Sequence, residues 1–292
     1  MNNLPEVRRK RLKQALKDKK HLRALEASNG LTGIIVENAK ADNKEFDAIW
    51  ISSLCDSTLK GKPDNELVDF SSRVKTIEEI SEVTSKPIIV DGDTGGQTEH
   101  FIHNVRTLER LGVSAVIIED KKGLKHNSLL DCSEHTLEDK EVFAERIRQG
   151  KLSLQSDDFM IIARIESFIA GKDLNDALNR AEAYINAGAD GIMIHSRKKD
   201  GREILDFIAE FKSRYRSIPL VLVPTAYNHF KDTELFALGA DIIIYANHLL
   251  RSSYKIMNLV AEKILQDESS EKVSENYCAS MEEILQITGD CK

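Results

Sequence analysis

Acidic side chains recur at the ends of short apolar runs along this chain of 292 residues. Asp91 and Asp93 end one run, Glu119 ends the next, and a third run carries Arg164 and Glu166. Burying these carboxylates together would be prohibitively unfavourable without a cation. Oxygen ligands with no cysteine beside them favour a hard ion, Mg²⁺ or Mn²⁺, over zinc. Asp91 and Asp93, two positions apart on a predicted strand, should share one face of it.

Cationic side chains fall on the same predicted strand ends. Lys121 and Lys125 follow the fourth apolar run, Arg164 lies in the fifth, and His195 ends the sixth. Because a guanidinium can bind phosphate or carboxylate through two hydrogen bonds, a metal faced by these groups suits a small, multiply charged anion. A single carboxylate at a strand end could instead cap a helix. Several in succession predict a metal-assisted site.

Eight apolar runs alternate with helical patterns and would position these side chains. Most runs are continuous, as expected for parallel strands buried on both faces. The pattern predicts an α/β fold, a (β/α)₈ TIM-type barrel with an extra N-terminal helix (about 6–20) and C-terminal helices; an open doubly wound sheet is the alternative. Catalytic groups gather at the C-terminal ends of such strands. The predicted strands are His21–Ala27, Asp47–Ser53, Pro87–Asp93, Ala115–Asp120, Phe159–Ser167, Gly191–Ser196, Pro219–Pro224 and Asp241–Asn247.

Composition argues against several classes of protein. The chain is 41% hydrophobic and 30% charged with a formal net charge of -7, so a global positive field for nucleic acid is absent. Its four cysteines are far apart and show no CxxC spacing, which argues against a zinc site or a disulfide framework. No apolar run approaches the roughly 18 residues of a membrane span, and the N-terminus has no signal or transit pattern. We expect a cytoplasmic protein that binds neither nucleic acid nor a membrane.

The whole chain, 1–292, is predicted to form a single domain. A barrel over about 21–265 would be followed by a C-terminal helical extension over about 266–292. The polar stretch Gln266–Asn276 is typical of a linker, and a short helix is predicted near Ser280–Ile287. The apolar face of that helix suggests that it docks elsewhere.

The polar strand ends resemble those of the phosphoenolpyruvate mutase family, within the phosphoenolpyruvate mutase/isocitrate lyase superfamily. PIIVDGDTG at 87–95 resembles the DxDTG metal-binding segment of the superfamily. EDK at 119–121 with KHNS at 125–128 resembles the EDK-x₃-K-x-NS gating loop of the mutases. The sequence departs from the family where Gly92 replaces a common Ala and Ser53 replaces a common Gly. Further similar segments are Trp50–Leu54, Gly61–Asp64, Ala163–Glu166, His195–Ser196, Val223–Thr225 and Ala246–His248.

The resemblance implies how the metal and a phosphoryl group are held. Asp91 would bind Mg²⁺ directly, with Mn²⁺ possible, and Asp93 and Glu119 would hold its water ligands. Asp64 would also act through water, and it is the candidate nucleophile if the phosphoryl group passes through the enzyme. Direct transfer through a metaphosphate-like species is the alternative. The implied catalytic residues are Asp64, Lys125, Asn127, Ser128, Arg164 and His195.

The implied reaction moves the phosphoryl group of phosphoenolpyruvate from the enol oxygen to C3. The product, phosphonopyruvate, contains a C–P bond, as phosphonate biosynthesis requires. Backbone groups of Ser52–Leu54 would receive the substrate's carboxylate and enol oxygen. Segments 61–63 and 121–133 are candidate lids or ordinary surface loops, and Trp50 would line the pocket or simply pack. The implied substrate-binding residues are Trp50, Ser52, Ser53, Leu54, Lys121 and Glu166.

Three other functions compete with this interpretation. A carbon–carbon lyase of the superfamily would carry a cysteine in a KKCGH-like gate, whereas Cys132 lies beyond the motif here. A phosphonopyruvate hydrolase usually has Thr where Asn127 stands. A non-catalytic scaffold would be expected to lose some of the site residues.

The resemblance also implies an assembly. In the superfamily, C-terminal helices pack against a neighbouring subunit, which predicts a homodimer or homotetramer. The alternative is a helix folded back on its own barrel.

Overall fold

The computed structural model describes residues 4–19, 21–123, 125–128 and 135–289. Its first compact unit extends to Ala246 and contains a closed barrel of eight parallel strands in the order β1-β10-β9-β8-β7-β6-β5-β4. The eight predicted strands and the barrel are therefore confirmed, and the open sheet is excluded. The barrel strands are β1 (Leu22–Glu26), β4 (Ala48–Ile51), β5 (Ile88–Asp91), β6 (Ala115–Glu119), β7 (Met160–Ile165), β8 (Gly191–Ile194), β9 (Leu220–Leu222) and β10 (Ile242–Tyr245).

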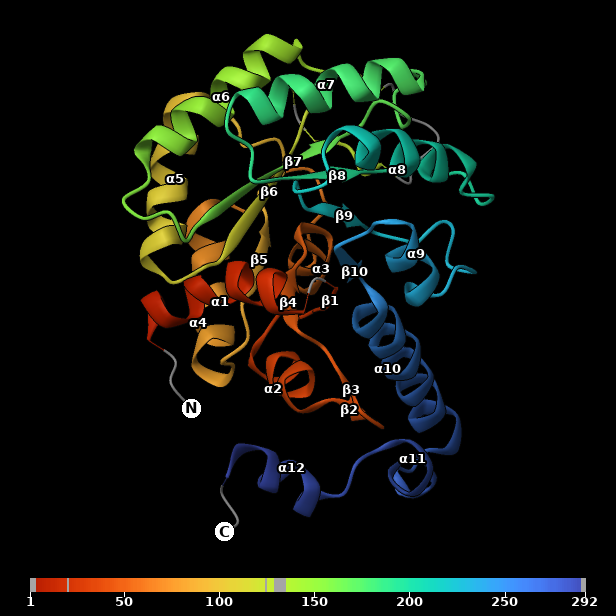
Figure 1. The fold of residues 1–292 in the computed structure, drawn as a ribbon. Coiled ribbons are helices and arrows are strands. Elements are labelled where there is room, and N and C mark those ends of the chain that lie inside the picture. Colours follow the sequence, from red (N-terminus) through yellow and green to blue (C-terminus); the bar gives the residue numbers. More distant parts are fainter. Residues whose placement is uncertain (1–3, 20, 124, 129–134, 290–292) are drawn as a thin grey trace. The chain divides into compact units, whose positions relative to one another are not determined.

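Helices surround the barrel, with α5 to α8 on the outside of strands β5 to β9 (Figure 1). A small antiparallel pair, β2 (Lys40–Ala41) and β3 (Lys44–Glu45), precedes β4. The helices of this unit are α1 (Pro5–Asp18), α2 (Gly30–Asn38), α3 (Ser53–Leu59), α4 (Phe70–Val83), α5 (Thr98–Arg110), α6 (Lys140–Ser153), α7 (Leu174–Asn186), α8 (Arg202–Arg214) and α9 (Asp232–Leu238).

Alternate strand residues fill the barrel interior, because successive side chains of a strand point to opposite faces. Trp50 and Ile89 are paired in register and belong to one buried cluster with Ile117 and Ile162. Leu12 of α1 is fully buried in the same cluster, among the first residues of the strands. The N-terminal helix therefore closes the end of the barrel opposite the strand C-termini.

The second compact unit extends from Asn247 and consists of three helices, α10 (His248–Asp267), α11 (Glu271–Tyr277) and α12 (Met281–Thr288). The helix predicted near the C-terminus is confirmed as α12. The predicted linker is wrong, because α10 continues into it and α11 occupies most of it. Val273 of α11 is the one buried residue in the described helices of this unit. The stretch is therefore polar although it is helical.

No helix in the described part of the chain combines the length and apolar character needed to cross a membrane. The single-domain organisation stays a prediction, as does the barrel boundary near residue 265. The contacts group α10 with the two helices that follow it.

Candidate active site

A polar layer lies one step above the hydrophobic interior of the barrel. Two positions beyond the interior residues Ile89, Ile117 and Ile162, the strands carry Asp91, Glu119 and Arg164. Strand alternation keeps these side chains on the inner face, so strands from different parts of the chain deliver charged groups to one place. All three side chains are buried. The predicted strand-end residues thus meet at the C-terminal mouth.

One cluster in the mouth is a set of carboxylates around the ammonium group of Lys125. Its Nζ lies 2.7 Å from Asp93 Oδ1, 3.3 Å from Asp64 Oδ1 and 3.6 Å from Asp91 Oδ2. It also donates a hydrogen bond to Ser53 Oγ, which itself donates to Asp91 Oδ2 at 2.8 Å. Five predicted site residues from four segments of the chain therefore share one cluster.

Asp93 reaches this cluster differently from our prediction. Strand β5 ends at Asp91, and Asp93 lies in the following turn with φ of 53°. The two residues therefore do not share a strand face. A left-handed backbone costs a non-glycine residue roughly 1–2 kcal/mol, although Asp tolerates it better than most. The Asp93 amide donates to Asp91 Oδ1 at 3.2 Å and helps to hold the turn.

A second cluster surrounds Glu166. Arg164 Nε donates to Glu166 Oε1, and Ser128 Oγ donates to Glu166 Oε2 at 2.6 Å. Lys121 Nζ lies 3.1 Å from the same Oε2, and 3.5 Å from Glu119 Oε1. These contacts join two predicted catalytic residues, Arg164 and Ser128, to two predicted substrate-binding residues, Lys121 and Glu166.

His195 joins the second cluster through its Nδ1 atom. Arg164 Nη2 lies 2.8 Å from Nδ1, and Glu166 Oε1 lies 3.1 Å from it. A guanidinium only donates and a carboxylate only accepts, so Nδ1 accepts from Arg164 in the tautomer with its proton on Nε2 and donates to Glu166 in the other tautomer. Burial, reinforced by Arg164, lowers the His195 pKa and favours the neutral ring. In the first tautomer the ring offers its Nε2–H to an anion.

The gate segment lies closed against the mouth where it is described. Its Lys125 enters the carboxylate cluster, Asn127 Nδ2 donates to Asp64 Oδ2 at 2.9 Å, and Ser128 contacts Glu166. Lys121 Nζ braces the loop by donating to the His126 carbonyl at 2.9 Å. Residue 124 and residues 129–134, including Cys132, lie outside the described part of the chain.

The loop 61–63 is exposed and leads directly into Asp64. Because Asp64 contacts both Lys125 and Asn127, this loop and the gate meet over the site. The contact favours the interpretation of loop 61–63 and of the described gate residues as lids.

Four predicted substrate-binding positions lie at the β4–α3 junction or just before it. Ser52 accepts the Cys55 amide proton at 3.4 Å and caps α3, and Leu54 lies in the first turn of that helix. The Ser53 amide donates to Asp91 Oδ2 at 3.3 Å. Trp50 packs in the barrel interior, and its Nε1 has no hydrogen-bond partner among the described residues. The structure does not bring the Trp50 side chain into either charged cluster.

The pKa values of the buried carboxyls diverge. Burial opposes ionisation of Asp91, but Lys125 and Arg73 outweigh it and hold the Asp91 pKa below its ordinary value. Burial likewise opposes ionisation of Glu166, but Arg164 and His195 keep its pKa well below the usual range. For Glu119, burial prevails and raises the pKa to about 7. Pairs of acids with separated pKa values are typical of functional sites.

Two residues next to the site were missed. Arg73, on α4, donates from Nη1 to Asp93 Oδ2 and to the Asp91 carbonyl, each at 2.7 Å. A helix residue far from any strand end gives no sequence signal for such a role. Glu26 is different, because it is buried at the end of β1. The expectation that catalytic groups gather at the C-terminal ends of strands, which we call the strand-end rule, would have found it.

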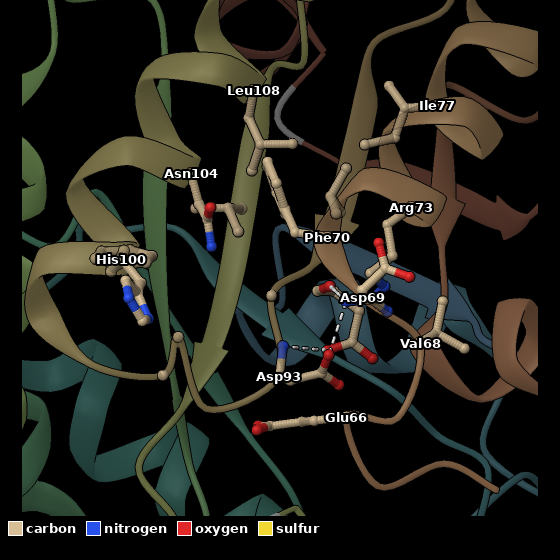
Figure 2. A pocket seen from close by; sticks show the side chains of 17 residues that line it. Glu66, Val68, Asp69, Phe70, Arg73, Ile77, Asp93, His100, Asn104 and Leu108 are labelled. Carbon is tan, nitrogen blue, oxygen red and sulfur yellow. Dashed lines mark hydrogen bonds and ion pairs between the residues drawn. The ribbon is translucent and has the colours of Figure 1, made fainter.

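A cavity of about 210 Å³ lies behind the carboxylate cluster, between α4, α5 and the end of β5. In the view of Figure 2, Asp93 and Glu66 lie at one end of it, and Leu108 and Ile77 lie at the other. Its lining includes Arg73 but not Lys125 or Arg164. Asp93 is therefore approached from two sides, by Arg73 from the cavity side and by Lys125 from the mouth.

The donor set fits a hard divalent cation. Asp64 Oδ1 and both carboxylate oxygens of Glu119 are buried without a hydrogen-bond partner in the described part of the chain. Carboxylate oxygens are the ligands that Mg²⁺ and Mn²⁺ prefer. In this arrangement no three Asp, Glu, His or Cys side chains among the described residues converge closely enough to hold an ion. The Lys125 ammonium lies among them instead.

Comparison with known proteins gives a consistent family. The family profile described as phosphoenolpyruvate phosphomutase matches residues 12–265. A phosphoenolpyruvate phosphomutase of Tetrahymena pyriformis is 37% identical over 281 residues, covering 96% of this chain and 90% of the relative.

Two solved structures share the fold at 33% identity. A phosphoenolpyruvate phosphomutase from Streptomyces platensis subsp. rosaceus has a TM-score of 0.89, with 96% of this chain and 94% of that chain covered. A phosphonopyruvate hydrolase in complex with oxalate and Mg²⁺ has a TM-score of 0.86, with 97% and 95% covered. The chain belongs to the phosphoenolpyruvate phosphomutase family.

Proposed function

We propose that the protein is an isomerase that interconverts phosphoenolpyruvate and phosphonopyruvate by moving the phosphoryl group between the enol oxygen and C3. The observation that carries the proposal is the closed gate, on which Lys125, Asn127 and Ser128 each contact a residue of the mouth. Water admitted during transfer would capture the phosphoryl group, so a mutase must seal its site. Relatives that are phosphomutases support the same reaction.

The cationic groups of the mouth suit the phosphoryl group. Phosphoryl transfer passes through a loose transition state with charge spread over three oxygens, so positioning and electrostatic stabilisation are the main tasks of the protein. Arg164 supplies a permanent charge, and His195 supplies an Nε2–H donor in the tautomer that is protonated there. Asn127 can donate without adding charge. Ser128, between Lys121 and Arg164, couples gate closure to the same anion.

We propose Mg²⁺ as the metal, with Mn²⁺ as a substitute. Asp91 would bind it directly, and Asp64, Asp93 and Glu119 would hold its water ligands. The cation would supply positive charge to stabilise the enolate of pyruvate. The Mg²⁺ complex of the structurally similar phosphonopyruvate hydrolase supports this choice.

Phosphonopyruvate hydrolysis is the second candidate function. A solved hydrolase and a solved mutase are each 33% identical in sequence to this chain. The experiment is to incubate the purified protein with phosphonopyruvate and Mg²⁺ and to identify products by ³¹P NMR. Phosphoenolpyruvate would support the mutase, whereas pyruvate with inorganic phosphate would support the hydrolase. No turnover would contradict both and favour a scaffold.

We also propose a homodimer or homotetramer. The second unit exposes many large apolar side chains, which is unusual for helices that remain in water. The most exposed are Tyr254, Met257, Leu265 and Met281. A second copy of the chain would cover them. Light scattering at micromolar concentration should give a dimer or tetramer mass, and a monomer would contradict this proposal.

A further inference from the structure

The side chain of Asp93 must be oriented by its surroundings, because Asp93 stands in a turn and not on a strand. Its backbone is left-handed, with φ of 53°, a conformation that residues other than glycine rarely adopt. From this turn Oδ1 faces the mouth, where Lys125 Nζ lies 2.7 Å away. Asp93 is also one of the carboxylates proposed to hold the water ligands of Mg²⁺. A group that fixes the turn therefore fixes a carboxylate of the metal site.

One nitrogen atom of Arg73 holds this turn at two points. Nη1 donates to the Asp91 carbonyl and to Asp93 Oδ2, each at 2.7 Å. The first bond holds the backbone where β5 ends, and the second orients the carboxylate so that Oδ1 remains for the mouth. The bond to the carboxylate is charge-assisted, which makes it stronger than a bond between neutral groups. Arg73 comes from α4, on the cavity side, and so acts from behind the mouth (Figure 2).

Arg73 is itself held by a buried carboxylate of α3. Its Nε lies 3.9 Å from Asp56 Oδ2. The other oxygen of Asp56 accepts hydrogen bonds from Thr76 Oγ1, at 2.7 Å, and from Lys60 Nζ. Thr76 follows Arg73 by one turn of α4, so both side chains lie on the helix face that contacts Asp56. Asp56, Arg73 and Thr76 are all buried, so water screens this ion pair weakly.

We propose that Arg73 is a positioning residue of the metal site, which acts through Asp93 and touches neither the metal nor the substrate. Its guanidinium, held by Asp56, fixes the turn after β5 so that Asp93 Oδ1 points into the mouth before the metal binds. An oxygen that is already in place need not be ordered when the ion binds, so binding is tighter. This inference rests on the metal site of the proposed function, but not on which product forms.

Two simpler roles for Arg73 make different predictions. A guanidinium that only balances buried carboxylates repels a divalent ion, so its removal would tighten metal binding. A guanidinium that only stabilises the fold would leave the metal affinity unchanged when it is removed. A guanidinium that orients Asp93 would weaken metal binding when it is removed, although a positive charge has gone. The direction of the change in metal affinity therefore separates the three roles.

The test is Mn²⁺ binding without substrate, measured by isothermal titration calorimetry. Arg73→Met should bind Mn²⁺ at least about tenfold more weakly than the wild type, equivalent to about 1.4 kcal/mol. Arg8→Met is the matched control, because Arg8 is also buried and also donates to backbone carbonyls. Arg8 lies on α1, at the opposite end of the barrel. Its variant should lose stability and keep the wild-type affinity for Mn²⁺.

A second variant, Arg73→Lys, keeps the buried charge, so the test does not depend on Arg73→Met being folded. The lysine ammonium lies one bond nearer the backbone than Nη1 and should not restore both hydrogen bonds. We expect its affinity for Mn²⁺ to fall by at least about threefold, because lysine does not replace arginine where the guanidinium geometry is used. Wild-type affinity in Arg73→Lys, or tighter binding in Arg73→Met, overturns the inference. So does a loss of affinity in Arg8→Met as large as that in Arg73→Met.

The two proposals fail separately. Equal Mn²⁺ affinity in the wild type and both Arg73 variants overturns the role of Arg73 and leaves the metal site intact. An absence of Mn²⁺ binding in the wild type overturns the metal site and the role of Arg73 together. Weaker binding in the Arg73 variants of a protein that makes no phosphoenolpyruvate supports this inference and contradicts the mutase.

Discussion

Two neighbouring residues at the end of β6, Glu119 and Asp120, face opposite sides of the barrel wall. Both are buried, and burial raises both pKa values, to about 7 for Glu119 and about 6 for Asp120. Asp120, on the outer side, accepts hydrogen bonds from the Glu166 amide at 2.8 Å, Tyr184 at 2.7 Å and Arg180 at 3.1 Å. Glu119, on the inner side, has ion pairs but no hydrogen bond to either oxygen from the described residues.

The difference separates a structural carboxylate from one kept for a ligand. The hydrogen-bonding capacity of Asp120 is used within the protein, where it fixes the backbone of Glu166 behind the site. Glu119 bears the cost of burial without these bonds, as expected of a group whose partner is a bound ion or its water. We expect changes on the inner side to impair function and changes on the outer side to impair folding.

The largest effect should come from another inner carboxylate, Asp91. We expect Asp91→Ala to lower turnover of phosphonopyruvate by at least about 10³-fold, because a metal contributes several kcal/mol to stabilising the transition state. The assay is steady-state turnover with saturating Mg²⁺. Exhaustive EDTA treatment of the wild type should cause a comparable loss, and full activity after it would end the idea of a metal enzyme.

Asn127, on the gate, should follow. We expect Asn127→Ala to lower mutase turnover by at least about 10²-fold, the scale for losing one preorganised donor. Folding should be unharmed, since a polar gate adds little to the core. Phosphoenolpyruvate and pyruvate should both be quantified, because some lost flux can reappear as pyruvate and phosphate. Wild-type mutase turnover in the variant would contradict the role of the gate.

Asp120→Asn tests the outer side of the wall. An amide has one acceptor oxygen, so its NH₂ group must face the Glu166 amide or the Tyr184–Arg180 pair, and a donor would oppose a donor. We expect a loss of about 2 kcal/mol in the free energy of unfolding, measured with urea in EDTA. Glu119→Gln is the matched control on the inner side and should lose no stability. Equal losses in the two variants would erase the distinction.

A separate effect should appear in the pH dependence of stability. A carboxyl whose pKa is raised by folding stabilises the folded state while it is protonated, and this contribution is lost as pH rises toward the folded-state pKa. For Glu119 the loss should therefore extend from about pH 4.5 to about 7. In EDTA, Glu119→Gln should gain stability relative to the wild type between pH 5 and pH 8. A constant difference across this range would contradict the raised pKa.

Local patterns predicted the barrel well, because each strand is a continuous apolar run with its polar residues at one end. The strand-end rule also brought Asp91, Glu119, Arg164 and His195 together, since strand alternation determines their side. It could not find Arg73 or the Tyr184–Arg180 pair, which reach the site region from helices through long-range packing.

Two errors have a shared origin in backbone detail. Asp93 was assigned to a strand, whereas its left-handed φ places it in a turn. The stretch from Gln266 was assigned to a linker, whereas α11 is a polar helix that follows a short break. The position of Lys125 among three carboxylates of two other segments also needed the folded structure.

Closure of the barrel has a consequence for synthesis of the chain on the ribosome. Strand β1 pairs with β10 through Leu22 and Ile242, so the first strand made must wait for the last. The buried Leu12 of α1 also lies in a cluster that includes Ile242. Contacts of such large sequence separation form slowly. We expect the backbone groups on the β10-facing edge of β1 to stay unpaired until most of the chain has emerged from the ribosome. Chaperones that shield strand edges should therefore speed folding of the chain in cells.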